Sequence, residues 1–314
     1  MLQQMPLADA IISRPFGRSG DIEKVLAFVR QIAQRSKRPE LNMHVGDVAW
    51  RINRSNSFNP TNAIQLWTDV TSDDILGMGW YTAAHHGVDM LVAEQAKATG
   101  LEKRILTWAE QKFRQFPYEQ RGNAELKIQV QEWDTEREQL LSNAGYRRDM
   151  FHYVWFKQPL SREIDKVSLH SGFTIQPVSE SHAAERAELH NLAFFVDDVT
   201  KTSYLQVIAS SVYRPKTDLV AVAPDGRLAA FALGWIDPVL KTGLFEPVGT
   251  HPDFRRLGLA KALLFAGMES MQAAGMRSAL VYTESPNLNA QKLYRSAGFS
   301  VEGRQFDWVR ASIR

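Results

Sequence analysis

Two stretches of this chain, far apart in the sequence, repeat the same pattern of residues. The segment DTEREQLLSNAGYRRDMFHYVWFK (134–157) aligns with NLNAQKLYRSAGFSVEGRQFDWVR (287–310). The matched residues are Leu140 with Leu293, Ala144-Gly145-Tyr146 with Ala297-Gly298-Phe299, and Trp155 with Trp308. An internal repeat of this kind indicates one structural unit that has been duplicated and has then diverged.

The order of predicted elements repeats as well. Periodicity and turn residues predict first-half helices at 21–35, 100–113 and 134–144, and strands at 63–70, 75–83, 88–93, 124–130 and 150–157. In the second half they predict helices at 183–192, 202–212, 259–274 and 288–297, and strands at 175–178, 218–223, 227–235, 278–283 and 306–310. The fold class is therefore α/β, with two mixed, mostly antiparallel sheets flanked by helices.

Length and composition fit two soluble globular domains. The chain has 314 residues, of which 44% are hydrophobic and 23% are charged, so each half is able to bury a core. The polar stretch 159–172 follows a terminal strand and is the expected boundary. We expect one domain at 1–160 and a second at 172–314.

Several classes of protein are disfavoured. The net charge of +2 is spread along the chain and does not indicate nucleic-acid binding, and no apolar run approaches the length that spans a bilayer. The N-terminus lacks the pattern of a signal peptide. The absence of cysteine removes disulfides, thiolate zinc sites and a Cys-acyl mechanism, and no metal motif occurs, so we expect a cytoplasmic protein without a metal. The oligomeric state stays open.

A basic, glycine-containing loop follows the apolar strand that begins at Leu244. The sequence Arg255-Arg256-Leu257-Gly258-Leu259-Ala260 has the form R-x-x-G-x-A and opens a predicted helix. N–H groups in the first turn of a helix have no partners within the helix, and the helix dipole adds positive charge there. Gly258 lets the backbone approach a phosphate closely, and the two arginines add charge-assisted donors. The loop therefore predicts a phosphate or pyrophosphate site.

A second motif lies about thirty residues further on. The run at 287–299 reads N-x-x-A-x-x-L-Y-x-x-x-G-F and follows the strand-like 278–283. In this order and spacing the two motifs resemble the GNAT superfamily of acetyl-CoA-dependent N-acyltransferases. The resemblance covers roughly 172–314 well and the first half weakly. It implies two tandem GNAT-like domains.

The resemblance assigns cofactor contacts for acetyl-CoA. Backbone groups of one strand would bind the pantetheine arm and the thioester carbonyl, the loop would bind the pyrophosphate, and two asparagines would bind the cofactor chain. The strand residues are Val248, Gly249 and Thr250, the loop residues are Arg255, Arg256, Leu257, Gly258, Leu259, Ala260 and Lys261, and the asparagines are Asn287 and Asn289.

Two residues are candidates for proton transfer. Tyr294 would sit near the sulfur, where its phenol is able to protonate a leaving thiolate; the alternative is a tyrosine that packs in the core. Glu246 shares a strand face with Val248 and Thr250 and is the candidate base, acting through a water. Its alternative is a carboxylate that pairs with a cation or binds the substrate amine.

The first copy has lost both features. It has Glu94-Gln95-Ala96-Lys97-Ala98-Thr99-Gly100 in place of the arginine loop, and Leu141 in place of Tyr294. We therefore expect the first domain to be structural or to shape the acceptor site. Phe194, Phe195, Tyr204, Tyr213 and Trp235 are weaker candidates for lining an acceptor pocket, and Asp197 and Asp198 for holding a cationic amine.

The sequence thus predicts acetyl transfer to a small-molecule or peptide amine by direct attack in a ternary complex. Three alternatives remain. One is a non-catalytic acyl-CoA sensor or scaffold, and another is a tandem acetyltransferase resembling mycothiol synthase. The third is an aminoacyl-tRNA-dependent transferase, against which the intact R-x-x-G-x-A loop argues, because that group does not use CoA.

Overall fold

The chain folds into two compact units, and each unit takes segments from both halves of the sequence. The computed structural model describes residues 6–55, 58–115, 124–161, 163–165 and 168–310. Within these residues, unit 1 comprises Met1–Asn42, Asn59–Tyr153 and Gly303–Arg314, and unit 2 comprises Met43–Phe58 and Val154–Glu302. The units thus differ from the expected linear segments 1–160 and 172–314. Residues 162, 166 and 167 of the predicted boundary lie outside the described residues.

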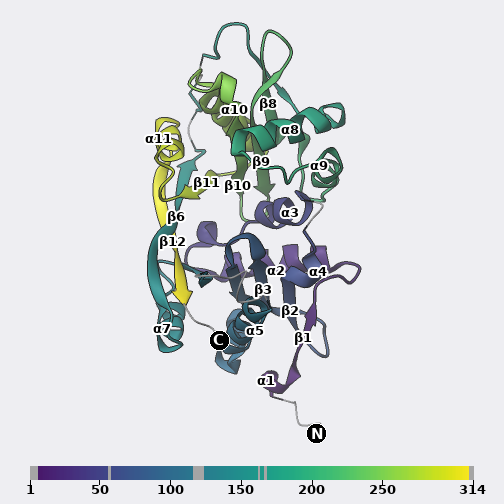
Figure 1. The fold of residues 1–314 in the computed structure, drawn as a ribbon, viewed down its shortest axis with the longest axis vertical. Coiled ribbons are helices and arrows are strands. Elements are labelled where there is room, and N and C mark those ends of the chain that lie inside the picture. Colours follow the sequence, from purple (N-terminus) through teal and green to yellow (C-terminus); the bar gives the residue numbers. More distant parts are fainter. Residues whose placement is uncertain (1–5, 56–57, 116–123, 162, 166–167, 311–314) are drawn as a thin grey trace. The chain divides into compact units, whose positions relative to one another are not determined.

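Unit 1 is a sheet with strand order β1-β2-β3-β4-β5-β12 and helices packed on it (Figure 1). Its strands are β1 (Ile11–Pro15), β2 (Ile64–Asp69), β3 (Ile75–Thr82), β4 (Gly87–Val92), β5 (Leu126–Gln131) and part of β12 (Ser300–Arg310). Its helices are α1 (Leu7–Ala10), α2 (Asp21–Arg35), α4 (Pro60–Ala63), α5 (Leu101–Arg114) and α7 (Thr135–Asn143). Neighbouring strands run antiparallel, except the parallel pair β4 and β5.

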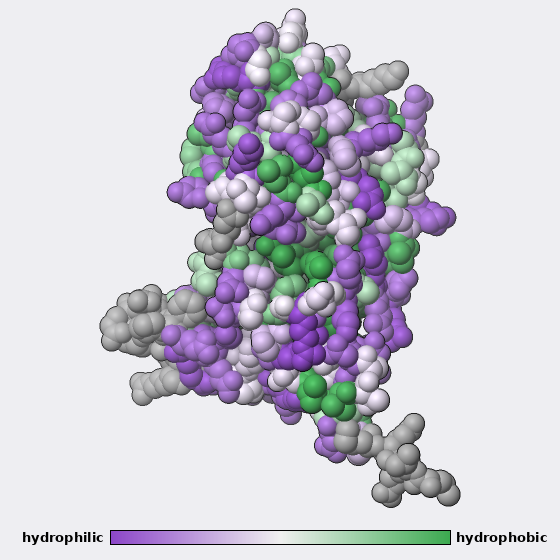
Figure 2. Space-filling model, turned by 90° about the vertical axis from the view of Figure 1, so that its right-hand side faces the viewer, coloured by the Kyte–Doolittle hydropathy of each residue, from purple (hydrophilic) through white to green (hydrophobic). Residues whose placement is uncertain are grey.

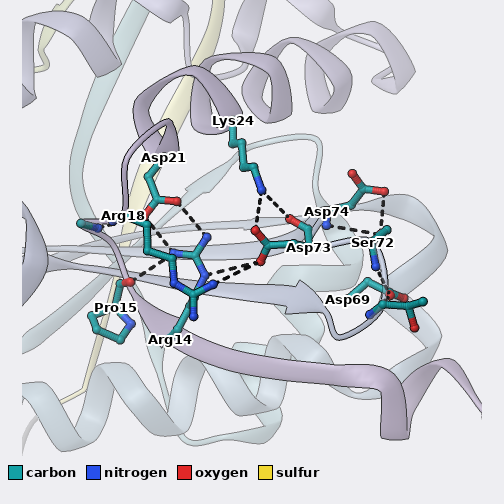
Figure 3. Close-up of polar contacts among 11 residues, drawn as sticks. Arg14, Pro15, Arg18, Asp21, Lys24, Asp69, Ser72, Asp73 and Asp74 are labelled. Atoms are coloured by element: carbon teal, nitrogen blue, oxygen red, sulfur yellow. Dashed lines mark hydrogen bonds and ion pairs between the residues drawn. The ribbon is translucent and has the colours of Figure 1, made fainter.

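A buried ion pair fixes the start of α2 in unit 1. The guanidinium of Arg14 donates two hydrogen bonds of 2.8 Å to the carboxylate of Asp21, which also accepts the backbone N–H groups of Gly17 and Arg18 at 2.9 Å (Figure 3). Burial by itself would raise the pKa of Asp21, but these hydrogen bonds lower it to about 2. Asp21 therefore stays ionised and holds β1 and the preceding turn against the helix.

Unit 2 has the strand order β6-β11-β10-β9-β8-β7. Its strands are β7 (Thr174–Pro177), β8 (Asp218–Val222), β9 (Leu228–Asp237), β10 (Thr242–Thr250), β11 (Ser278–Glu284) and part of β6 (Arg147–Pro159). Its helices are α3 (Val45–Asn53), α8 (Ala183–Phe194), α9 (Lys201–Ile208), α10 (Leu259–Ala273) and α11 (Leu288–Ser296). Most predicted elements are confirmed within a few residues, whereas α3, α1, α4 and β1 were not predicted.

The two copies exchange their last strands. Residues 303–310 of β12 belong to unit 1, where 305–310 pair with β5, whereas residues 154–159 of β6 belong to unit 2, where β6 is the neighbour of β11. Each duplicated sequence therefore completes its sheet with a strand from the other copy. A linear domain boundary is not possible for this arrangement.

The sequence repeat is also a repeat of backbone geometry. Helices α7 and α11 are capped by the side chains of Asp134 and Asn287, which accept N–H groups of Arg137 and Ala290. After each helix the chain turns at a glycine with positive φ, Gly145 at 82° and Gly298 at 90°. A left-handed residue just past a helix favours glycine, which has no Cβ to clash. This geometry accounts for the matched Ala-Gly-aromatic triplets.

Helices cover both faces of the unit 2 sheet. Gly234 and Gly243 face Met271 of α10, because a Cβ at either position would lie within 3 Å of that side chain. On the opposite face, Trp235 and Phe231 meet α3 and α8. The core beneath α10 is formed by buried residues that include Phe245, Leu263, Leu264, Met268, Met271 and Val281.

Candidate functional site

The sheet of unit 2 opens between β10 and β11. The two strands pair in parallel only from Thr242 with Ser278 to Leu244 with Leu280. Beyond this point β10 continues to Thr250 and pairs with β9 alone. The backbone groups of Val248, Gly249 and Thr250 on the β11 side are therefore available to a ligand.

Glu246 lies where the strands separate. Pairing of β10 with β9 shifts register between Phe245 and Val248, and the peptide bond from Glu246 to Pro247 is cis. Glu246 is half-buried as a residue, and burial is the largest influence on its carboxyl. The register shift is a β-bulge, and it interrupts the alternation by which Glu246 was expected to share a strand face with Val248 and Thr250.

The phosphate loop has the predicted backbone form. Gly258 adopts φ 75° as the N-cap of α10, and Arg256 adopts φ 68°. No described side chain caps α10, so the N–H groups of its first turn remain unpartnered by side chains, as an anion site requires. Leu259 is buried in the core, whereas Arg256 is exposed and Lys261 is half-buried. The loop therefore fits a pyrophosphate mainly through its backbone.

Arg255 makes contacts within the protein that the sequence did not predict. Its Nη2 donates a 3.1 Å hydrogen bond to the carbonyl of Ala193, and its guanidinium lies 5.2 Å from the ring centre of Phe195. The carbonyls in the last turn of a helix lack intrahelical donors, and a cation there is favourable. Arg255 thus ties the C-terminus of α8 to the start of the loop.

The two asparagines lie at the start of α11. The Oδ1 of Asn287 accepts the N–H of Ala290 at 3.1 Å and so caps the helix. Asn289 lies in the first turn and is exposed. Asn287 therefore has a structural role whether or not it also contacts a cofactor, and Asn289 is accessible.

Tyr294 is buried near the centre of unit 2. Its ring packs against Phe156 and Phe299 at centroid distances of 5.7 and 6.3 Å. Burial and the nearby Glu246 carboxylate raise the pKa of the Tyr294 phenol. The phenol therefore keeps its proton throughout the physiological range.

The surroundings of Glu246 favour its protonated form. Burial, followed by the charge of Asp47, raises the pKa of Glu246 to about 8, against opposing effects of Arg54, the Tyr282 hydroxyl and Arg51. A carboxyl with a pKa near neutrality is suited to accept a proton from an ammonium group. The structure brings Glu246 near enough to Tyr294 for its charge to raise the pKa of the phenol.

Sequence reasoning missed Asp47, which α3 brings to this site from the first half of the chain. The N–H of His44 donates to its Oδ2 and the hydroxyl of Tyr282 donates to its Oδ1, both at 2.9 Å. Tyr282 in turn stacks against Trp155 with ring centres 4.6 Å apart. The only sequence signal was the pattern His44-x-x-Asp47 before an apolar run, a capping box with an unusual first residue.

The weaker acceptor candidates separate into two groups. Tyr204, Tyr213 and Trp235 are buried, and both tyrosines donate hydrogen bonds to Asp218, so these three form part of the interior. Phe194 and Phe195 are exposed at the end of α8. Asp198 pairs with Arg54 at 2.7 Å.

Apolar surface is visible on the side of unit 2 that carries α8 and α9 (Figure 2). A pocket of about 500 Å³ lies there, lined by Ala184, Ala187, Glu188, Asn191, Leu192, Phe195, Val196, Val199, Thr200 and Lys201. It includes neither Glu246 nor Tyr294. Within the described ranges, no helix is long and apolar enough to cross a bilayer, and no group of acidic and histidine side chains is placed to hold a metal ion.

Part of unit 2 is similar in sequence to a known family. Residues 184–299 match the family model described as acetyltransferase (GNAT) family. Mycothiol acetyltransferase from Arthrobacter sp. (strain FB24) is 31% identical over 107 residues, which are 33% of each chain. Mycothiol acetyltransferase from Clavibacter michiganensis subsp. michiganensis (strain NCPPB 382) is 35% identical over 92 residues, which are 29% of each chain. The matches thus span about a third of the length of these curated relatives.

Structural similarity extends over nearly the whole chain. A GCN5-related N-acetyltransferase from Sphaerobacter thermophilus superposes with a TM-score of 0.64 at 20% identity and covers 98% of both chains. A tandem GNAT protein from the clavulanic acid biosynthesis pathway gives a TM-score of 0.64 at 15% identity, covering 96% of this chain and 98% of the other. These likenesses confirm the predicted fold class and the duplication.

Proposed function

We propose, from the membership of residues 184–299 in the GNAT acetyltransferase family, that this chain transfers the acetyl group of acetyl-CoA to an amine. The observation that carries the proposal is the opening between β10 and β11, where Glu246 lies beside an unpaired strand edge. The helix-start phosphate loop follows the same strand. A donor bound along this edge would present its acyl group to the carboxyl.

The backbone accounts for donor binding. Val248 to Thr250 would hydrogen-bond the pantetheine arm, and the first-turn N–H groups after Gly258 would hold the pyrophosphate. Gly249 is required at this strand, because a Cβ there would lie 2.4 Å from the ring of Phe231 and 3.0 Å from Ala193. Arg256, Lys261 and Asn289 would add side-chain contacts.

The chemistry requires two proton transfers. Acetyl-CoA supplies an activated acyl group as a thioester. As the new N–C bond forms and the C–S bond breaks, Glu246 would take the amine proton, directly or through a water, and Tyr294 would give its phenolic proton to the sulfur. Asp47 and Glu246 together would favour a cationic amine near the acyl carbon. No covalent enzyme intermediate is needed.

Unit 1 is proposed to be structural. Its corresponding helix α5 also starts at a glycine with positive φ, Gly100 at 76°. The preceding segment is a 3-10 helix (Glu94–Thr99) whose Lys97 is paired with Glu94 at 2.9 Å, and no arginines stand there. We also propose a cytoplasmic location, because the chain contains no cysteine, which suits a reducing compartment.

A second candidate is the activity of the mycothiol acetyltransferases, favoured by 31% identity over 107 residues. The acceptor is then the substrate of those enzymes rather than a general amine. A panel that includes that substrate, polyamines, amino sugars and peptide N-termini separates the two candidates by kcat/KM. A sensor or scaffold would bind the donor but release no CoA thiol with any acceptor.

The test is a calorimetric titration of acetyl-CoA followed by the acceptor panel. We expect one donor site per chain and thiol release with at least one amine. Two sites per chain would show that unit 1 also binds. Absence of donor binding would overturn the proposal.

A further inference from the structure

Trp235 lies between the two backbone segments that carry the acidic groups of the site. It is fully buried in β9, opposite Leu244 of β10. Its indole Nε1 donates a 2.7 Å hydrogen bond to the backbone carbonyl of Glu246. The side chain therefore contacts the residue that carries the candidate base, without itself reaching the reacting atoms.

The bulge makes this hydrogen bond necessary. Phe245 pairs with Gly234 and Val248 pairs with Ala232, so Glu246 and Pro247 together stand opposite the single residue Leu233. A regular antiparallel ladder therefore does not hold this part of β10, and proline has no N–H to contribute. The indole supplies a donor from within the sheet to the carbonyl at the bulge.

The side chain of Trp235 also packs against α3. A Cβ on Gly46 would lie 2.3 Å from Cγ and 2.6 Å from Cδ1 of Trp235, distances that real atoms do not reach. Only glycine lets the first turn of α3 rest directly on the indole. The next residue is Asp47, which accepts the Tyr282 hydroxyl. The Trp235 side chain thus contacts the backbone of Glu246 and the residue next to Asp47.

We propose that Trp235 is a positioning residue that sets the placement of Glu246 relative to Asp47, and so the alignment of base and amine. The inference rests on the proposed acetyl transfer. Glu246 is affected by Asp47 and Arg51 of α3, by Arg54 just after that helix and by Tyr282 of β11, and it raises the pKa of Tyr294 of α11 in turn. Moving the bulge changes all of these distances together.

The principal test is Trp235→Phe, which keeps an aromatic ring but removes the N–H. We expect acetyl-CoA affinity within about twofold of wild type, because the phosphate loop is untouched. We expect kcat/KM for the acceptor to fall about tenfold or more. The acid limb of its pH profile should move to lower pH, because a carboxyl released toward water ionises more easily. A purely structural role would not shift the pH profile.

Two further variants control the test. Trp80→Phe removes a buried indole from β3 of unit 1 and should leave the pH profile unchanged. Gly46→Ala pushes α3 away from the ring and should give the same phenotype as Trp235→Phe. If Trp235→Phe does not fold, as judged by thermal unfolding, Gly46→Ala carries the test.

The outcomes separate this inference from the proposed function. If the wild-type protein transfers acetyl groups, and Trp235→Phe and Gly46→Ala retain its pH profile and its kcat/KM for the acceptor, the inference is overturned and the proposed function stands. A wild-type protein without transfer to any acceptor overturns both. Effects of the two variants that combine less than additively support a shared role of the ring.

Discussion

The hydroxyl of Tyr282 donates a 2.9 Å hydrogen bond to Asp47, although 235 residues separate them in the sequence. Both belong to unit 2, since α3 packs with the second half of the chain. Asp47 also caps its own helix through the N–H of His44. Its carboxylate is thus fixed from two sides and adds a defined negative charge beside Glu246.

Replacing Asp47 by Asn should alter the pH dependence of transfer. Asp47 is the second cause, after burial, of the raised pKa of Glu246, so its loss should move the acid limb of kcat/KM to lower pH. The KM of a cationic amine should rise. Asp225→Asn, at an exposed turn, is the matched control. An unchanged acid limb would remove Asp47 from the site.

The wild-type profile follows from the same carboxyl. A base acts only when ionised, and the pKa of Glu246 is raised to about 8, so kcat/KM should increase as the pH rises from 6 through about 8. Glu246→Gln should lower kcat by about 10²-fold or more, since general base catalysis contributes that much. Steady-state kinetics over this range provide the check. A flat profile would contradict the assignment.

Tyr294→Phe should slow turnover with little effect on donor binding. Tyr294 is buried, with 6% of the residue exposed, and the packing of its ring survives the change. The fold should therefore persist. We expect kcat to fall about 10²-fold, as for the loss of a general acid. Tyr146→Phe, at an equally buried tyrosine of unit 1 that contacts Glu110, controls for the loss of a buried hydroxyl. Normal turnover would make Tyr294 a core residue only.

Arg256→Ala combined with Gly258→Glu should abolish acetyl-CoA binding while the fold remains. No atom lies within 4 Å of a Cβ at Gly258, so the cost is the left-handed backbone, about 1 kcal/mol. Gly100→Glu is the matched control, with φ 76° and the same open space at the start of α5. Calorimetry should show donor binding lost only in the first variant. Equal affinity in both would refute the loop as the phosphate site.

The role of Arg255 is testable on its own. The Arg255 side chain donates to the carbonyl of Ala193 and lies over the ring of Phe195. Arg255→Ala should therefore loosen the end of α8. Donor affinity should fall less than in Arg256→Ala, which removes an exposed cation of the loop. Isothermal titration of both variants measures the difference. A larger loss for Arg255 would favour the direct phosphate contact that the sequence predicts.

Asp21→Asn should destabilise unit 1 by about 3 kcal/mol at neutral pH, because it removes the buried partner of Arg14 and leaves its 3.7 Å ion pair with the more exposed Asp73. The pKa of Asp21 is lowered to about 2, below its unfolded value. Its stabilising effect is therefore complete above about pH 4 and is lost as the pH falls toward 2. Urea unfolding at pH 7 and pH 3 should show a smaller difference at pH 3. Asp225→Asn, on an exposed hairpin, is the control.

Local patterns were enough for most of the fold. The glycine at the end of each repeated helix and the R-x-x-G-x-A loop are set by residues within one turn of each other, so the sequence specifies their geometry. These features depend on backbone sterics and short-range hydrogen bonds, which a reader of the sequence is able to follow.

The tertiary structure alone decided which segments share a site. Nothing near Asp47 in the sequence indicates Tyr282, nothing near Trp235 indicates Gly46, and the exchange of β6 and β12 is invisible in a repeat that aligns end to end. Such pairings arise from burial of apolar surface between distant segments, which is not directional along the chain. The repeat thus determined two GNAT-like folds, whereas long-range packing determined where the acidic groups meet.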